Sequence, residues 1–180
     1  FLSFYKEITN TAGDYGMSTV YRGWNHWPIT VYNPAFAWQG VDLRSAASTA
    51  MDDWETPALA DLFVTTDSPD EADVVIVYDT ISYFHHHVAT LEYNPDGTPK
   101  RKELRIYTQY SEVPIRIYAQ LVFAHEFGHV IGFVHSRNIG HLMMGLMMPI
   151  EESPTVDEIN AVRCLYHFPN IFDYSCVIDE

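Results

Sequence analysis

The sequence has few basic residues and no long apolar run. Of its 180 residues, 10 are Lys or Arg and 24 are Asp or Glu, so the formal net charge is −14. Nucleic-acid binding and a polybasic membrane anchor both need a positively charged face, so this charge argues against both. No apolar stretch approaches the roughly 20 residues of a membrane-spanning helix, so we expect no membrane span.

Cysteine is also scarce. Cys164 and Cys176 lie near the C-terminus and do not form a C-x-x-C spacing, which makes them poor candidates for metal ligands. They either close a small disulfide loop in an oxidising compartment or remain two thiols. Hydrophobic residues, in contrast, make up 47% of the chain, which is enough to build a core. A chain of this length suits a single domain.

The hydrophobic pattern predicts a chain in which strands and helices are mixed. Apolar positions recur every three or four residues over 41–55 and 114–131, as in helices with one buried face. A T-x-x-E capping box at Thr155 and Glu158 predicts a last helix over 155–166. Short runs rich in apolar and β-branched residues predict strands at 28–32, 59–65, 72–78, 88–93 and 103–108. We therefore expect an α/β sheet with right-handed crossovers.

Three histidines and a glutamate stand in one motif that begins at His125-Glu126 and ends at His135. His125 and His129 are four residues apart on a predicted helix, so both imidazoles project from one face and can share a metal ion. Gly132 permits a sharp reversal that would bring His135 back as a third ligand. Three imidazoles leave one position of a tetrahedral zinc open, which is typical of a catalytic site.

Glu126 follows the first ligand and can lie beside the metal without binding it. We interpret Glu126 as the general base for a metal-activated water that attacks a peptide carbonyl. Two histidines and a glutamate on an otherwise apolar helix would be costly to bury without a metal or polar partners, which argues against a purely structural role. The motif therefore predicts a zinc-dependent endopeptidase with one catalytic zinc.

The motif HExxHxxGxxH resembles that of the metzincin zinc endopeptidases, and within this clan the chain is most similar to the matrixins. Ser136, directly after the third histidine, is typical of matrixins. The text ADVVIVY at 72–78 and the text DEINAVRCLY at 157–166 are similar to matrixin catalytic domains in order and position. The resemblance covers about residues 25–168.

This resemblance implies the metzincin fold. We expect a twisted, mostly parallel five-stranded sheet with two packed helices, one of them the active-site helix, and a C-terminal subdomain with a Met-turn and a final helix. The chain would form a single catalytic domain over 1–180, divided into subdomains of about 1–132 and 133–180. We expect a secreted or extracytoplasmic monomer that acts on a protein or peptide substrate.

The Met-turn of the family has two candidates in this sequence. Met143 stands eight residues after the third histidine, which is the matrixin spacing, whereas Leu146-Met147-Met148-Pro149 matches the family text L-M-x-P. We favour Met147 and keep Met143. Either would place a thioether beneath the three imidazoles, and ordinary core packing is the alternative role for these residues.

The resemblance also implies how a substrate is held. Metzincins bind an extended peptide antiparallel to an edge strand, and we expect Val88, Ala89 and Thr90 to lie on that strand. Leu121, one turn before the first histidine, and the segment that contains Pro149 would line the pocket after the scissile bond. Because this lining is apolar, we expect a preference for a hydrophobic residue after the scissile bond.

The sequence departs from the matrixin pattern in one region. It lacks the spaced His and Asp residues of the family's structural zinc site. The histidines at 85, 86 and 87 fall in this region, but neighbouring strand residues point to opposite faces, so the three cannot easily share an ion. We interpret them as a polar loop or edge, with a second metal site or a cleft contact as alternatives. Calcium stays open as a second cation.

Two other functions remain alternatives to the endopeptidase. One is a catalytically silent peptide-binding module that keeps the metzincin fold, although the intact Glu126 argues against it. The other is a metzincin outside the matrixins with narrow specificity. Cleavage assays would separate the first alternative from the endopeptidase, and the geometry of the Met-turn would identify the second.

Overall fold

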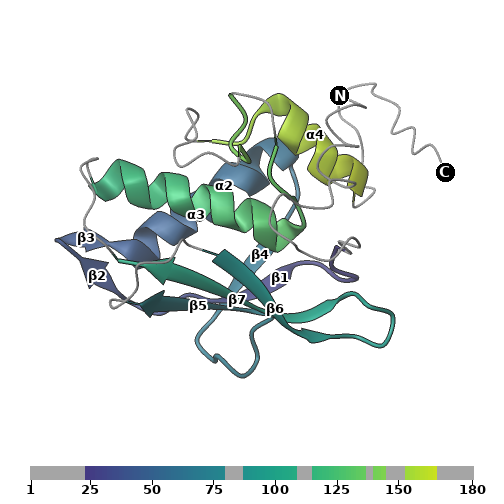
Figure 1. The fold of residues 1–180 in the computed structure, drawn as a ribbon, viewed down its shortest axis with the longest axis horizontal. Helices are drawn as coiled ribbons and strands as arrows, with labels where there is room; N and C mark the ends of the chain where they lie inside the picture. The colour runs from purple at the N-terminus through teal and green to yellow at the C-terminus, as the bar shows by residue number, and fades with distance from the viewer. Residues whose placement is uncertain (1–22, 80–86, 109–114, 137–139, 145–152, 166–180) are drawn as a thin grey trace.

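A computed structural model describes residues 23–79, 87–108, 115–136, 140–144 and 153–165. Figure 1 shows a twisted sheet with helices α2 (Leu43–Ala58) and α3 (Ile115–Ile131) over one of its faces, and a third helix, α4 (Val156–Leu165), which contacts α2. Within these described ranges, no helix is both long and apolar enough to cross a membrane.

The sheet has five strands in the order β4-β1-β5-β7-β6. Neighbours are parallel except for β6, which pairs antiparallel with β7 and forms one edge. The turn before β7 has the chemistry of a tight reversal, with Gly97 at φ 83° and its N–H donating to the carbonyl of Asn94. The strands are β1 (Ile29–Tyr32), β4 (Phe63–Thr66), β5 (Val74–Asp79), β6 (His87–Tyr93) and β7 (Pro99–Tyr107).

Helix α2 begins two residues later than its apolar pattern predicts. Two short strands that the sequence pattern did not indicate, β2 (Ala37–Trp38) and β3 (Val41–Asp42), pair antiparallel before it. Asp42 ends this hairpin and caps the helix, because its carboxylate accepts the N–H of Arg44 at 3.0 Å. At the other end, Leu59 takes φ 52° and closes the helix with a left-handed residue.

The core lies between the helices and the sheet. Trp54 of α2 is fully buried, and its indole Nε1 donates to the carbonyl of Ala124 in α3 at 2.9 Å. Phe127 of α3 packs its ring against Phe63 of β4, with ring centroids 5.1 Å apart. The core therefore holds the buried face of α3 against both α2 and the sheet. This packing fixes the orientation of the face of α3 that points away from the core.

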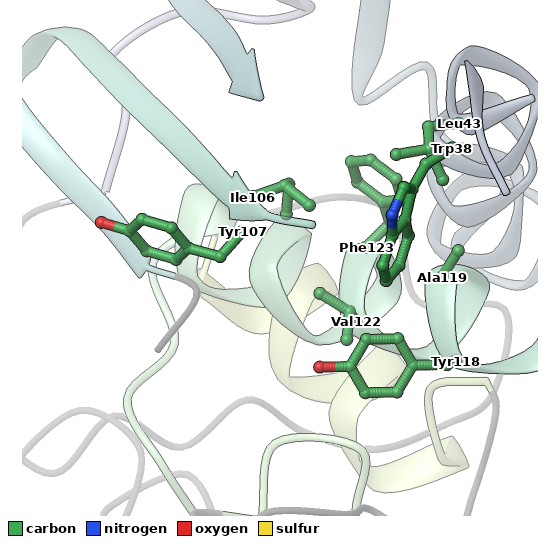
Figure 2. Close-up of a pocket in the computed structure, with 8 residues that line it drawn as sticks. All are labelled: Trp38, Leu43, Ile106, Tyr107, Tyr118, Ala119, Val122 and Phe123. Carbon is green, nitrogen blue, oxygen red and sulfur yellow. The ribbon is translucent and has the colours of Figure 1, made fainter. Parts of the chain in front are cut away.

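A small apolar pocket lies where the start of α2, the end of β7 and α3 meet (Figure 2). Burial raises the pKa of Tyr118 at its rim, and the negative charge of Glu126 on the same helix adds to this effect. The lining is apolar and aromatic and consists of Trp38, Leu43, Ile106, Tyr107, Tyr118, Ala119, Val122 and Phe123.

Helix α4 begins with the predicted capping box. The N–H of Glu158 donates to Thr155 Oγ1 at 3.3 Å, and the Glu158 carboxylate accepts from both the N–H and the hydroxyl of Thr155 at 2.7 and 2.8 Å. This reciprocal pair fixes the first turn of α4. The pairing of Cys164 with Cys176 concerns side chains that lie outside the described residues.

Candidate metal centre

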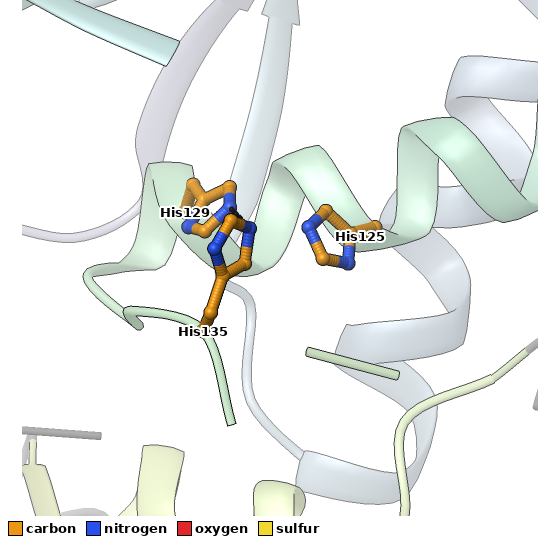
Figure 3. A group of neighbouring side chains, drawn as sticks. All are labelled: His125, His129 and His135. Carbon is orange, nitrogen blue, oxygen red and sulfur yellow. Dashed lines mark hydrogen bonds between the residues drawn. The ribbon is translucent and has the colours of Figure 1, made fainter. Parts of the chain in front are cut away.

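The three histidines of the motif converge on one point in space (Figure 3). His125 and His129 project from one face of α3, and His135 returns toward them from the segment after the helix. One ligand nitrogen from each ring lies within 4.8 Å of the other two. Among the residues that the structure describes, no other group of three His, Cys, Asp or Glu side chains meets in this way.

A reversal directly after α3 brings the third histidine back. Gly132 has φ 136°, a backbone conformation that side chains rarely adopt. The N–H groups of Gly132 and Phe133 both donate to the carbonyl of Gly128, at 3.0 and 2.9 Å. Two residues farther on, His135 Nε2 lies 3.2 Å from His129 Nε2.

Backbone carbonyls select the ring tautomer of the two helical histidines. His125 Nδ1 lies 2.8 Å from the carbonyl of Leu142, and His129 Nδ1 lies 2.7 Å from the carbonyl of Phe133. A carbonyl oxygen only accepts, so each Nδ1 carries the proton and each Nε2 is left unprotonated. This arrangement presents both rings as metal ligands and resembles the outer hydrogen bonds of zinc-binding histidines in general.

The rings are also held in the uncharged form that a metal requires. Burial lowers the pKa of His125 to about 4, although its bond to the Leu142 carbonyl opposes this change. Burial likewise lowers the pKa of His129 and of His135 below the ordinary value for histidine. Three neutral imidazoles suit zinc. The residues therefore fit a zinc ion.

Glu126 is buried beside the first ligand in the sequence. Its side chain is 5% exposed, and within the described part of the chain its Oε2 atom has no hydrogen-bond partner. Burial raises the pKa of Glu126 to about 8. A buried carboxyl oxygen of this kind normally has a partner such as water, a substrate or an ion. Its position in the motif is the one expected for a general base.

Met143 is buried and lies against α3 at Gly128, the residue before His129. A Cβ atom added to Gly128 would clash with Met143 Sδ and lie 3.0 Å from Trp54 Cζ2, so the approach of this thioether depends on a glycine. The carbonyl of Met143 accepts the N–H of Ser136 at 2.6 Å, next to the third histidine. Met147, which the text L-M-x-P favours, lies outside the described residues, so the choice of Met-turn residue stays a prediction.

Glu158 orients the first ligand through the backbone, a role that sequence reasoning missed. Its fully buried carboxylate accepts the N–H groups of Leu142 and Met143 at 3.3 and 2.8 Å, in addition to its capping bonds. The carbonyl of Leu142 is in turn the acceptor for His125 Nδ1. The capping box is the one sequence signal at Glu158, because its bonds to Leu142 and Met143 join α4 to a distant, irregular segment.

The structure describes only some of the residues that the sequence predicts to bind substrate. Val88, Ala89 and Thr90 are half-buried on β6, the edge strand, whose described pairing is with β7 alone. Leu121 is 5% exposed and belongs to the core. Pro149 and the histidines at 85 and 86 lie outside the described residues, and so does the side chain of the histidine at 87.

The fold and the histidine triad together define a metalloprotein of the metzincin type. The family model described as Matrixin matches residues 24–167, which is more than half of the chain, so the chain belongs to the matrixin family. A search of curated proteins finds no match. The predicted resemblance and fold class are thereby confirmed, and family membership indicates a zinc metalloendopeptidase.

Proposed function

We propose that this protein is a catalytically active zinc-dependent endopeptidase in which Glu126 is the general base. The observation that carries this proposal is the state of the three histidines. Their nitrogens lie within 4.8 Å of one another, and the Nδ1 atoms of two rings bond to carbonyl acceptors, which leaves Nε2 unprotonated on both. A helix that merely satisfied buried histidines would not need three convergent lone pairs.

Each polar residue of the centre has a role in the proposed reaction. His125, His129 and His135 would hold zinc, which supplies Lewis acidity for the peptide carbonyl and for water. Glu126 takes the proton from the attacking water and passes it to the leaving amine. Burial raises the pKa of Glu126, which favours proton uptake from water, and a zinc ion at the histidines would lower this pKa again.

We further propose that β6 binds the substrate. An extended peptide can pair antiparallel with this edge strand along Val88, Ala89 and Thr90. The segment with Pro149 would face the residue after the scissile bond, with buried Leu121 as the floor of the pocket, and favour a hydrophobic side chain there. Cleavage of a peptide library, followed by sequencing of the products, tests this preference, and equal cleavage before charged and apolar residues would contradict it.

The remaining properties follow from the family as proposals. Matrixins are generally secreted or extracellular, and we propose the same for this chain. We also propose a monomer in which 1–180 form one catalytic domain. Elemental analysis of purified protein is expected to show one zinc per chain, and it would reveal calcium if that cation is bound.

A quenched peptide substrate tests the proposed activity. Wild-type protein should cleave it, and a zinc chelator should abolish cleavage. Glu126→Ala should keep one zinc per chain but lose activity by roughly 10²- to 10⁴-fold, the usual contribution of a general base. Glu71→Ala is the matched control, because Glu71 is an exposed glutamate in the loop between β4 and β5.

The outcomes separate the alternatives. Zinc binding by wild type without cleavage of any peptide would identify a silent peptide-binding module. Cleavage that survives both the chelator and Glu126→Ala would overturn the zinc mechanism. Loss of activity in Glu71→Ala to the same extent would show that the effect at Glu126 is not specific.

A further inference from the structure

Lys102 is a fully buried lysine that the proposed reaction does not use. It stands on β7 two residues before buried Leu104 and between half-buried Arg101 and Glu103, so the alternation of the strand places it on the same, core face as Leu104. Taking an ammonium group out of water costs several kcal/mol unless polar groups replace the water. The hydrogen-bond partners of Lys102 therefore indicate its role in the structure.

The partners are carbonyls at the end of the proposed metal-binding helix. Lys102 Nζ donates to the carbonyl of Val130 at 2.8 Å and to the carbonyl of His129 at 3.2 Å. Because the N–H groups of Gly132 and Phe133 go to Gly128, these two carbonyls accept from side chains. A cation at this end of α3 also interacts favourably with the helix dipole.

Trp24 completes this contact. Its indole Nε1 donates to the same Val130 carbonyl at 2.8 Å, and Lys102 Nζ lies 5.3 Å from the centre of a Trp24 ring. The arrangement adds a cation–π attraction to the two hydrogen bonds at this carbonyl. Lys102 and Trp24 thus form a clamp on the end of α3, with one member from β7 and the other from the chain before β1.

The clamp holds the segment that carries two of the three ligands. His129 is itself one of the clamped residues, and its Nδ1 bonds to the carbonyl of Phe133 on the way to His135. His135 lies in this segment with its Nε2 3.2 Å from that of His129. A shift at the end of α3 would therefore move both ligands relative to His125.

We propose that Lys102, together with Trp24, is a positioning residue for the metal centre and fixes the end of α3 so that His129 and His135 converge with His125 on one ion. The inference rests on the proposed zinc site. It assigns Lys102 no contact with substrate or metal. A lysine that served the core alone would affect stability without affecting the ligands.

Metal binding by matched variants tests this role. Lys102→Met removes the ammonium and keeps an unbranched side chain, and Leu104→Ala damages the same face of β7 without touching α3's last carbonyls. For each protein we would measure urea unfolding without metal, the zinc Kd by competition with a coloured chelator, and the visible spectrum with Co²⁺. Lys102→Met should raise the zinc Kd roughly 10- to 100-fold, as outer-sphere changes do, and alter the Co²⁺ spectrum. Leu104→Ala should lose stability but keep the wild-type Kd and spectrum.

The result that overturns the proposal is a zinc Kd and Co²⁺ spectrum in Lys102→Met equal to those of wild type. A change in Leu104→Ala as large as that in Lys102→Met would overturn it too. If Lys102→Met does not fold, Trp24→Phe decides, because it keeps the lysine and the ring but removes one clamp bond; an unchanged Kd there contradicts the proposal. Failure of wild type to bind zinc or Co²⁺ would instead overturn the proposed metal centre itself.

Discussion

Helices α2 and α3 lie side by side over the sheet and have nearly equal lengths of 16 and 17 residues, but they are stabilised differently (Figure 1). Helix α2 has local signals at both ends, since Asp42 caps its start and Leu59 closes its end. Its buried positions alternate with exposed polar ones such as Arg44 and Asp52. Local sequence therefore accounts for most of α2.

Helix α3 depends on the rest of the molecule. Its polar residue Glu126 is buried, and its last carbonyls are held by Lys102 and Trp24, which come from distant parts of the chain. Gly128 occupies a position where most helices would gain from alanine. Helix α3 therefore gives up local stability so that Met143 and Trp54 can approach its backbone, and its neighbours supply the support.

The largest expected effect is on the pH dependence of the unfolding free energy, and it comes from buried Glu126 of α3 in metal-free protein. The pKa of Glu126 is raised from 4.5 to about 8 in the folded state, so the folded state binds the proton more tightly and wild type loses stability as pH rises between these values. Glu126→Gln cannot ionise and should become more stable than wild type over this window, by up to about 1.4 kcal/mol per pH unit. Urea unfolding from pH 4 to pH 9 measures the difference. A difference in unfolding free energy between Glu126→Gln and wild type that does not change with pH would contradict the raised pKa of Glu126.

The next effect tests how much α2 supports α3. Trp54→Ala removes a fully buried ring and its hydrogen bond to Ala124, and should cost about 3–5 kcal/mol of unfolding free energy. Trp54→Phe keeps most of the ring volume and should cost about 1–2 kcal/mol. Thermal or urea unfolding measures both. A cost below about 1 kcal/mol for Trp54→Ala would mean that the two helices are stabilised independently.

A smaller effect is expected at the glycine of α3. Glycine to alanine in a helix usually stabilises by about 1 kcal/mol, but at Gly128 the new Cβ would meet Met143 and Trp54. We expect Gly128→Ala to destabilise by about 1–3 kcal/mol, the usual cost of overpacking. Ser45→Ala on the exposed face of α2 is the control and should be neutral or slightly stabilising.

A double-mutant cycle identifies the cause of the effect at Gly128. If the clash with Met143 is responsible, Gly128→Ala combined with Met143→Ala should cost less than the sum of the two single changes. Additive costs in urea unfolding would place the strain elsewhere. If Gly128→Ala stabilises the protein, α3 does not give up local stability at this glycine, and it does not differ from α2 in this respect.

The smallest effect belongs to the cap of α2. Asp42→Ala removes the acceptor for the N–H of Arg44 and should cost about 1 kcal/mol. Asp42→Asn keeps a capping oxygen and should cost less. Because the cap is remote from the histidines, neither change should alter the zinc Kd. A change in zinc affinity would show that α2 and the metal centre are coupled more closely than the contacts indicate.

Local patterns predicted the regular elements well and their ends less well. Helical periodicity located α2 and α3, and runs of β-branched residues located β1 and β5. Leu59, expected to begin a strand, is instead the left-handed residue that ends α2 and is 67% exposed. The start of α2 moved because Val41 and Asp42 pair with β2, and this pairing depends on a neighbouring strand that periodicity does not reveal.

The ligands of the candidate site could be predicted because their spacing follows from helix geometry and a glycine reversal. The groups that orient these ligands could not. Glu158 reaches Leu142 and Met143 from another helix, and Lys102 reaches α3 from a strand. Such bonds join a side chain to the backbone of a distant segment, so no periodic pattern records them.

The Glu158 carboxylate links two equilibria that are usually considered separately. Its Oε2 accepts from Thr155 at the first turn of α4, and its Oε1 accepts the N–H of Met143, in the peptide whose carbonyl orients His125. Linkage is reciprocal, so whatever free energy an intact α4 contributes to holding an ion at His125, the ion returns to the folding of α4. Filling the centre would therefore slow amide hydrogen exchange in the first turn of α4, so that this turn reports on occupancy of the metal centre.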